Sequence, residues 1–369
     1  MLSSGRAHNT LTLALSALML LLLAAACATP VSGPVVTTGV AETAPGGEAT
    51  DAHGGGAIHA EDEYDLPDLS PVTLVEGERL RVVATTNILG DVVRNIGGDQ
   101  IELTTLLPVG ADPHSYNATP ADLRMLSEAH VIFIVGEGIE ESLLPVIENR
   151  GGDSALVAVN TGINLMAMDA YEEDEVHEDE PEEAREGDEA DHDHGLDPHT
   201  WTAVPNVMHW VEIIEHALSE LDPANAETYE GAAGAYLAEL EALDTEIEAA
   251  VAAIPAENRK LVTDHETFGY FAAQYGFEII GTVIPSFSTL AAPSAQELAA
   301  LQRQLEAEGV RAIFVGSTVS PTLAQQIAND VGVRVTPLYS DSLSTSDGPA
   351  ATYIDLMRYN VASILAALE

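Results

Sequence analysis

The chain has 369 residues, of which 60 are Asp or Glu and 13 are Lys or Arg, giving a formal net charge of −47 at pH 7. Such an acidic chain repels phosphate backbones, which excludes nucleic acid as a partner, while its length is enough for about two domains. The only lysine, Lys260, lies outside any phosphate-loop motif, and the single cysteine, Cys27, excludes intrachain disulfides and cysteine-ligated clusters. Any bound metal must therefore be held by histidine and carboxylate.

Residues 1–26 are predicted to be a signal peptide. Arg6 precedes the apolar run Leu11–Ala26, which is shorter than the roughly 20 residues that a membrane-spanning helix needs. Cys27 follows three alanines directly, an arrangement that resembles the bacterial lipobox, in which cleavage frees the cysteine for acylation. The alternative is ordinary cleavage that leaves Cys27 unmodified. In either case we expect the mature protein to work outside the cytoplasm, anchored to the membrane where Cys27 is lipidated.

Residues 27–78 are rich in Ala, Gly, Thr, Pro and acidic residues and show no apolar period. This composition predicts a flexible, lipid-anchored acidic linker between the membrane and a folded body. From residue 79 the pattern changes to strand-like runs that alternate with helix-like stretches, which predicts an α/β lobe with a parallel sheet over residues 79–221. Its predicted strands are 80–85, 101–106 and 131–135, and its predicted helices are 88–96 and 120–128.

Residues 222–255 are predicted to form one long, rigid connecting helix. Asp222-Pro223 is typical of a helix start, with Asp as the cap and Pro in the first turn. Apolar residues then recur every three or four positions as far as Ile254, and Pro255 ends the pattern. At 1.5 Å per residue a helix over 224–254 would be about 46 Å long. Such a helix would run along two lobes and limit their closure.

A second α/β lobe is predicted over residues 256–369. Its strand-like runs are 261–263, 277–280, 312–315 and 333–335, and its predicted helices are 294–308, 321–331 and a closing helix from residue 350. The predicted fold class is therefore α/β, with two lobes that each contain a mainly parallel sheet flanked by helices. One long rigid helix joins the lobes, and a ligand site is expected in the cleft between them, where the carboxyl ends of strands meet.

Four motifs place metal-binding side chains in loops beside Pro or Gly, or after predicted strands. They are Pro113-His114-Ser115-Tyr116, Asp197-Pro198-His199-Thr200-Trp201, His265-Glu266-Thr267-Phe268-Gly269-Tyr270-Phe271 and Asp341-Ser342-Leu343. Loops from two parallel sheets can converge on one cleft. Three imidazoles and one carboxylate would make a four-ligand set suited to a divalent cation.

In this order the motifs resemble the metal motifs of the zinc/manganese solute-binding proteins of ABC transporters, the cluster A-I or ZnuA-like family. The resemblance covers about residues 79–369. It implies that His114, His199, His265 and Asp341 hold one metal ion between the lobes. It also implies two partners. The protein would pass the ion to a membrane permease, and the permease would work with a cytoplasmic ATPase.

The third motif indicates which metal is bound. Manganese-type members resemble this stretch but carry Glu where this chain has His265, and nitrogen-rich sites favour zinc over manganese. We therefore expect a monomeric, extracytoplasmic, high-affinity zinc-binding protein that is not an enzyme. It would capture Zn²⁺ and deliver it to the permease for import.

An acidic segment precedes the second motif. From Glu172 to His194, 14 of 23 residues are Asp or Glu, with His177, His192 and His194 interspersed. This composition cannot bury a core, so it predicts a disordered acidic loop. Zinc-type family members often carry a His-rich acidic insert at this place, and the resemblance implies that the histidines of this segment collect zinc weakly. The alternative is a solvated run of charge.

Three other functions stay open. The first is a manganese-binding protein (Mn²⁺) of the same type. The second is an extracytoplasmic zinc-dependent hydrolase in which the three histidines bind the metal and Glu266 is the base, which requires a water ligand. The third is an adhesin or zinc-buffering lipoprotein without a transporter. Glu266 is also an alternative oxygen ligand, unless it is simply a first-turn helix residue.

Overall fold

The computed structural model describes residues 66–67, 69–167 and 195–369. The signal peptide, Cys27 and the acidic histidine segment 172–194 lie outside these residues. The described residues contain two sheets of four parallel strands each, separated in sequence by two long helices. This arrangement confirms the predicted two-lobe α/β fold.

The N-terminal lobe is built on a parallel sheet with the strand order β2-β1-β3-β4. Its strands are β1 (Leu80–Ala84), β2 (Ile101–Thr105), β3 (Val131–Ile134) and β4 (Ala155–Ala158). Helices α1 (Asn87–Gly97) and α4 (Val204–Leu221) share a core with one face of the sheet, and α2 (Pro120–Glu128) and α3 (Leu144–Glu148) lie on the other side. The first three strands and two helices follow the predicted pattern, whereas β4 was not predicted.

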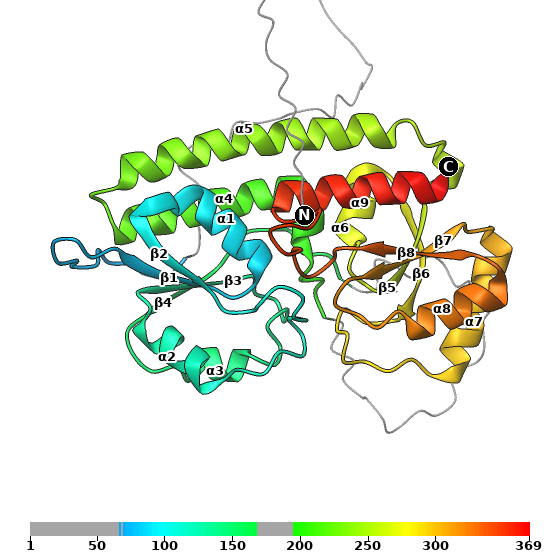
Figure 1. The fold of residues 1–369 in the computed structure, drawn as a ribbon, viewed down its shortest axis with the longest axis horizontal. Helices are drawn as coiled ribbons and strands as arrows, with labels where there is room; N and C mark the ends of the chain where they lie inside the picture. The colour runs from blue at the N-terminus through cyan, green and yellow to red at the C-terminus, as the bar shows by residue number, and fades with distance from the viewer. Residues whose placement is uncertain (1–65, 68, 168–194) are drawn as a thin grey trace, which may run out of the picture. The chain divides into compact units, whose positions relative to one another are not determined.

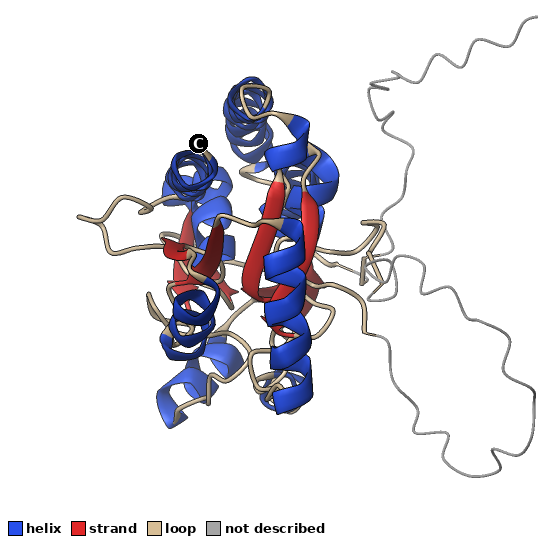
Figure 2. Cartoon of the chain, turned by 90° about the vertical axis from the view of Figure 1, so that its right-hand side faces the viewer, coloured by secondary structure: helices blue, strands red, loops and turns tan. Residues whose placement is uncertain are grey.

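The C-terminal lobe repeats this plan with the strand order β6-β5-β7-β8. Its strands are β5 (Lys260–His265), β6 (Glu278–Ile284), β7 (Ala312–Gly316) and β8 (Arg334–Leu338). Its helices are α6 (Gly269–Tyr275), α7 (Ala295–Glu308), α8 (Thr322–Val331) and α9 (Tyr353–Leu368). Figure 2 shows strands with helices on both sides. Asn87, three residues after β1, forms hydrogen bonds with Ser342 and Leu343, and His265, the last residue of β5, lies beside His114. The loops that follow β1 and β5 therefore meet between the lobes.

A continuous apolar core connects the two lobes. It runs from β1 and α1 through α4 and α5 (Ala226–Val251) to α9, β5 and β7. In Figure 1, α5 lies along both lobes, with α4 and α9 beneath it. Its 26 residues correspond to about 39 Å at 1.5 Å per residue. The lobes are therefore joined by shared packing as well as by one helix.

The connecting helix is shorter than predicted, because Asp222 caps the end of α4 and not the start of α5. Its Oδ2 accepts hydrogen bonds from Asn225 Nδ2 at 2.7 Å and from the Tyr229 hydroxyl at 2.9 Å. Asn225 is the residue that precedes the first turn of α5. At the other end Ile254 is buried but lies beyond the helix. The apolar pattern therefore continued past the point where the helix ends.

The predicted linker to residue 78 also ends earlier than expected. Leu69, Val72 and Leu74 are partly buried against the apolar core. The Val72 backbone N–H donates a hydrogen bond of 2.8 Å to the carbonyl oxygen of Leu221 at the end of α4. Residues 69–78 therefore belong to the folded body, because their apolar side chains find a surface that composition alone does not reveal.

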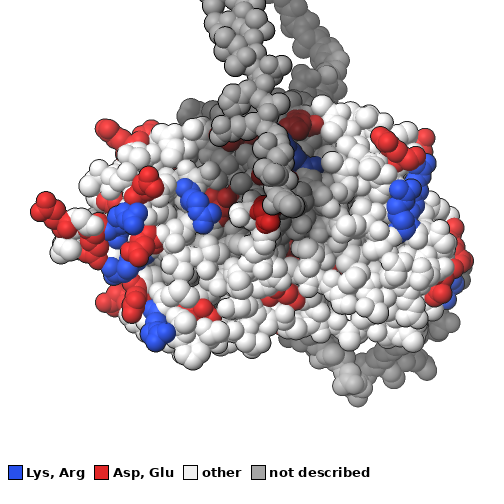
Figure 3. Space-filling view, in the orientation of Figure 1, with Lys and Arg blue, Asp and Glu red and all other residues white. Residues whose placement is uncertain are grey.

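Charged side chains on the face shown in Figure 3 are scattered, and basic ones stand near acidic ones. Arg358 pairs with Glu246 at 2.9 Å, and Lys260 pairs with Glu308. The described part of this face has no extended basic patch. Within the described ranges, none of the helices combines the length and the apolarity needed to cross a bilayer.

Candidate metal centre

The four predicted ligands lie together between the lobes, although they come from four separate segments. His114 lies in the loop between β2 and α2, and His199 precedes the short 3₁₀ helix Thr200–Thr202. His265 is the last residue of β5, and Asp341 follows β8. Each side chain offers one ligand atom, and these atoms all lie within 4.8 Å of one another. All four residues are at most 2% exposed.

The distances within this cluster suit a small cation. His114 Nε2 and His199 Nε2 are 3.3 Å apart, and His265 Nε2 is 3.9 Å from Asp341 Oδ1. Both His265 Nε2 and Asp341 Oδ1 are buried without a hydrogen-bond partner in the protein. Buried polar atoms are normally paired, so unpaired nitrogen and oxygen atoms that face one another are the donor set a cation would satisfy.

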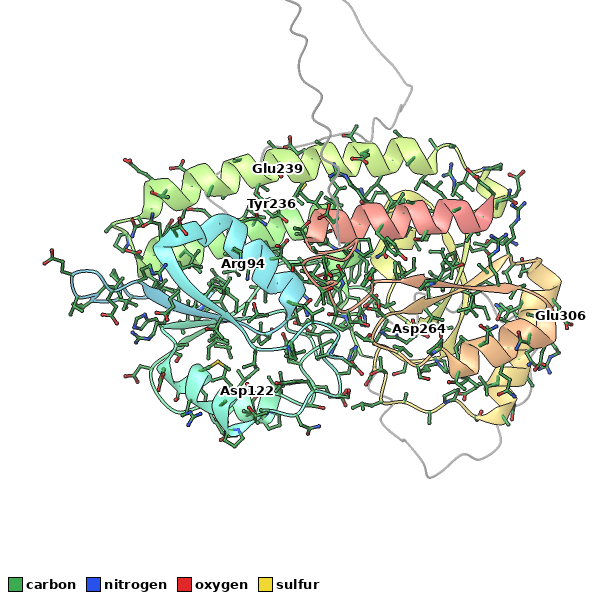
Figure 4. All side chains as sticks on the ribbon, viewed as in Figure 1. Arg94, Asp122, Tyr236, Glu239, Asp264 and Glu306 are labelled. Carbon is green, nitrogen blue, oxygen red and sulfur yellow. The ribbon has the colours of Figure 1, made fainter. Side chains whose placement is uncertain are left out.

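Two carboxylates orient two of the imidazoles. Asp197 Oδ1 lies 2.8 Å from His199 Nδ1, and Asp264 Oδ1 lies 3.1 Å from His265 Nδ1. Figure 4 marks Asp264 at the end of β5 nearest the other lobe. A carboxylate at one ring nitrogen fixes the proton there and leaves the other nitrogen free for a metal. In both residues Nε2 therefore faces the centre.

Asp341 is held by two hydroxyl groups. Its Oδ2 accepts hydrogen bonds from Thr318 Oγ1 at 2.8 Å and from Ser340 Oγ at 2.6 Å. These bonds turn Oδ1 toward His265. On the N-terminal side, Asp112 Oδ1 accepts a hydrogen bond of 3.0 Å from the His114 backbone N–H, which positions the loop that carries His114.

Hydrogen bonds between the lobes surround the site. The Trp201 indole N–H donates to the Ser340 carbonyl at 2.8 Å, and the Tyr270 hydroxyl donates to the Asp197 carbonyl at 2.8 Å. Thr289 Oγ1 donates to Asp112 Oδ2 at 2.7 Å. Each bond joins a residue near the site to the opposite lobe. Together they fix the position of the predicted ligands of the N-terminal lobe relative to those of the C-terminal lobe.

Burial and neighbouring charge separate the pKa values of the three histidines. Burial, with the neighbouring imidazoles, lowers the pKa of His114 to about 4 and that of His199 to about 3. Burial also acts to lower the pKa of His265, but Asp264 and Asp341 outweigh it and raise that pKa to about 9. In the metal-free protein at neutral pH, these shifts favour neutral His114 and His199 and a protonated His265.

The structure does not bring Glu266 into the cluster of four, as far as the described residues extend. Glu266 lines a separate cavity of about 440 Å³ with Thr267, Gly281 and Leu301. It is not a first-turn helix residue either, because α6 begins at Gly269. The weak-site histidines His177, His192 and His194 lie outside the described residues.

The sequence motifs did not reveal that Asp197 and Asp264 hold the imidazoles of His199 and His265. Asp197 stands two residues before His199, and Asp264 immediately precedes His265. Each accepts a hydrogen bond from the backbone N–H of its histidine, at 2.9 Å and 3.0 Å respectively. An Asp at one or two positions before a ligand histidine is the signal that could have found them.

Comparison with known proteins places this geometry among metal-binding proteins. The family model described as zinc-uptake complex component A, periplasmic, matches residues 82–367. The manganese-binding lipoprotein MntA of Halalkalibacterium halodurans is 33% identical over 299 residues, which cover 80% of this chain and 91% of that protein.

Solved structures share the fold. The periplasmic zinc binding protein TroA from Treponema pallidum has a TM-score of 0.67 and 27% identity, covering 79% of this chain and 99% of that one. An Mn-bound periplasmic metal binding protein from Candidatus Liberibacter asiaticus has a TM-score of 0.67 and 29% identity, covering 79% of this chain and 100% of its own. Zinc and manganese are thus both named among similar proteins.

Proposed function

We propose that this chain, which belongs to the family of the periplasmic zinc-uptake component A, captures zinc and passes it to a membrane permease. The chain is an extracytoplasmic substrate-binding lipoprotein of a metal ABC transporter and not an enzyme. The hydrolase alternative and the alternative of a lipoprotein without a transporter are therefore wrong. The proposal concerns the metal, the ligands, the acylation of Cys27 and the delivery step.

The close grouping of four buried side chains supports both the proposed ligands and the choice of zinc. His114, His199, His265 and Asp341 offer three nitrogen atoms and one oxygen atom within 4.8 Å of one another, and all four residues are buried. Zinc is commonly bound by four such ligands in a tetrahedral arrangement. Manganese prefers more oxygen ligands and a higher coordination number. This donor set supports zinc above manganese.

Capture and delivery follow from the origin of the ligands. His114 and His199 come from the N-terminal lobe and His265 and Asp341 from the C-terminal lobe, so a bound ion links both lobes. Binding would stabilise the closed arrangement, which the permease would recognise. Because the lobes share a continuous apolar core, release would proceed by displacement of the ligand loops and not by a wide hinge motion. Docking on the permease, powered by its ATPase, would supply that displacement.

The test is metal selection by the purified protein. Wild type and His265→Glu are each equilibrated with equal concentrations of Zn²⁺ and Mn²⁺, and bound metal is measured after separation from free ions. We expect wild type to carry zinc and His265→Glu to hold relatively more manganese, because an oxygen ligand replaces a nitrogen ligand. His216→Glu, an exposed position on α4, makes the same chemical change elsewhere and serves as the control. Wild type that selects manganese would contradict the proposal.

A further inference from the structure

Asp341 presents only one of its two carboxylate oxygens to the metal centre. Oδ2 accepts hydrogen bonds from both Thr318 Oγ1, at 2.8 Å, and Ser340 Oγ, at 2.6 Å. Oδ1 is buried, has no hydrogen-bond partner and lies 3.9 Å from His265 Nε2. The carboxylate is therefore divided, with one oxygen held by the protein and one directed at the other ligands.

The two hydroxyl groups are fixed in place by the end of β7. Ser340 is 1% exposed and packs against Gly316, where an added Cβ would lie 2.1 Å from Ser340 Oγ. Gly316 also donates its backbone N–H to Asp264 Oδ2 at 3.0 Å. Thr318 follows β7 by two residues. The end of β7 therefore orients both ligands of the C-terminal lobe, through Asp264 for His265 and through Ser340 and Thr318 for Asp341.

We propose that Thr318 and Ser340 are specificity-determining residues that keep Asp341 monodentate and so limit the metal to four protein ligands. The inference rests on the proposed function, since it explains how the same four ligands discriminate against manganese. Zinc accepts four-coordinate tetrahedral sites, whereas manganese is stabilised by additional oxygen ligands. Asp341 Oδ2 could supply an additional oxygen ligand only by breaking its two hydrogen bonds in a buried site. Restricting the site to four protein ligands therefore lowers the affinity for manganese more than the affinity for zinc.

The experiment removes the hydroxyl groups and measures selectivity and coordination separately. Thr318→Val, Ser340→Ala and the double variant are compared with wild type in competition titrations of Zn²⁺ against Mn²⁺. We expect the double variant to raise the manganese-to-zinc affinity ratio at least tenfold, or about 1.4 kcal/mol. With Co²⁺ as the probe, its visible absorption should weaken, because four-coordinate Co²⁺ absorbs more strongly than ions with more ligands.

Two control variants keep the result specific. Thr318→Ser retains the hydroxyl group and should behave as wild type. Thr322→Val removes a hydroxyl from the start of α8 that contacts Ser320 at 3.0 Å and not Asp341, and it should leave the affinity ratio unchanged. Thermal unfolding is recorded for each variant, and Thr318→Val alone provides the readout if Ser340→Ala fails to fold.

The outcomes separate this inference from the proposed function. Thr318→Val and the double variant with an unchanged affinity ratio and an unchanged Co²⁺ spectrum would overturn the role of the hydroxyl groups, even if wild type selects zinc. Equal loss of affinity for both metals would also overturn it, because that result indicates only structural damage. Wild type that selects manganese would contradict the proposed function, whereas the Co²⁺ spectra of wild type and variants would still report whether Asp341 changes its mode of binding.

Discussion

The raised pKa of His265 predicts that metal binding competes with a single proton. The metal needs the neutral imidazole, and at pH 7 a group with a pKa of about 9 is neutral in about 1% of molecules. The apparent affinity at pH 7 is therefore on the order of a hundredfold below its limit. His114 and His199, with pKa values of about 4 and about 3, are already neutral and contribute no proton.

Calorimetry measures this proton directly. Zinc is titrated at pH 7 in two buffers with different ionisation enthalpies, and the difference in heat gives the number of protons released. We expect about one proton per metal ion, and an apparent affinity that rises about tenfold per pH unit between pH 5 and 9. Release of two or three protons, or of none, would refute the assignment of charge to His265 alone.

Replacing Asp264 and Asp197 in turn tests whether Asp264 is the cause of the raised pKa of His265. Asp264 raises the pKa of His265 by its charge and by a hydrogen bond, so Asp264→Asn should reduce the number of protons released at pH 7. Asp197→Asn alters the equivalent partner of His199, which is neutral in either case, and should leave the release at about one proton. Equal behaviour of the two variants would contradict the argument.

The same shifts determine how the stability of the metal-free protein depends on pH. The raised pKa of His265 stabilises the fold fully below its ordinary pKa of about 6.5, and this contribution is lost as pH rises through about 9. The lowered pKa values of His114 and His199 act in the opposite direction. They favour unfolding increasingly as pH falls below about 6.5, because the unfolded chain then binds those protons.

Two further predictions concern the contact between lobes and the acidic segment. The buried Tyr353 hydroxyl donates a hydrogen bond of 2.8 Å to the Trp201 carbonyl, so Tyr353→Phe should lower the free energy of unfolding by about 1 kcal/mol. Urea denaturation measures this, with Tyr359→Phe on the same helix as control, and an unchanged midpoint would contradict it. Deletion of Glu172–Asp193 should leave one tight zinc site in calorimetric titration and abolish weaker binding. If the weaker binding persists, the segment does not collect metal.

Local sequence patterns were sufficient for much of the fold and for the four residues proposed to bind the metal. Alternating and helical apolar spacing identified β1, β2, β3 and most elements of the C-terminal lobe, because each element buries one face or one stripe of side chains. The candidate ligands His114, His199, His265 and Asp341, which the structure brings together, stand in short motifs whose order resembles one family. Both kinds of information lie within a few neighbouring residues.

Only the tertiary structure revealed the features that depend on contacts between residues far apart in the sequence. The pairing of β4 with β3, the packing of residues 69–78 and the role of Asp222 each depend on contacts that no local pattern records. The same holds for the metal centre, where Thr318 and Ser340 bind one oxygen of Asp341 and turn the other toward His265. Sequence by itself determined which residues could hold a metal. Only the folded chain determined how many of their atoms face it, because hydrogen bonding in a buried site selects the orientation of each side chain.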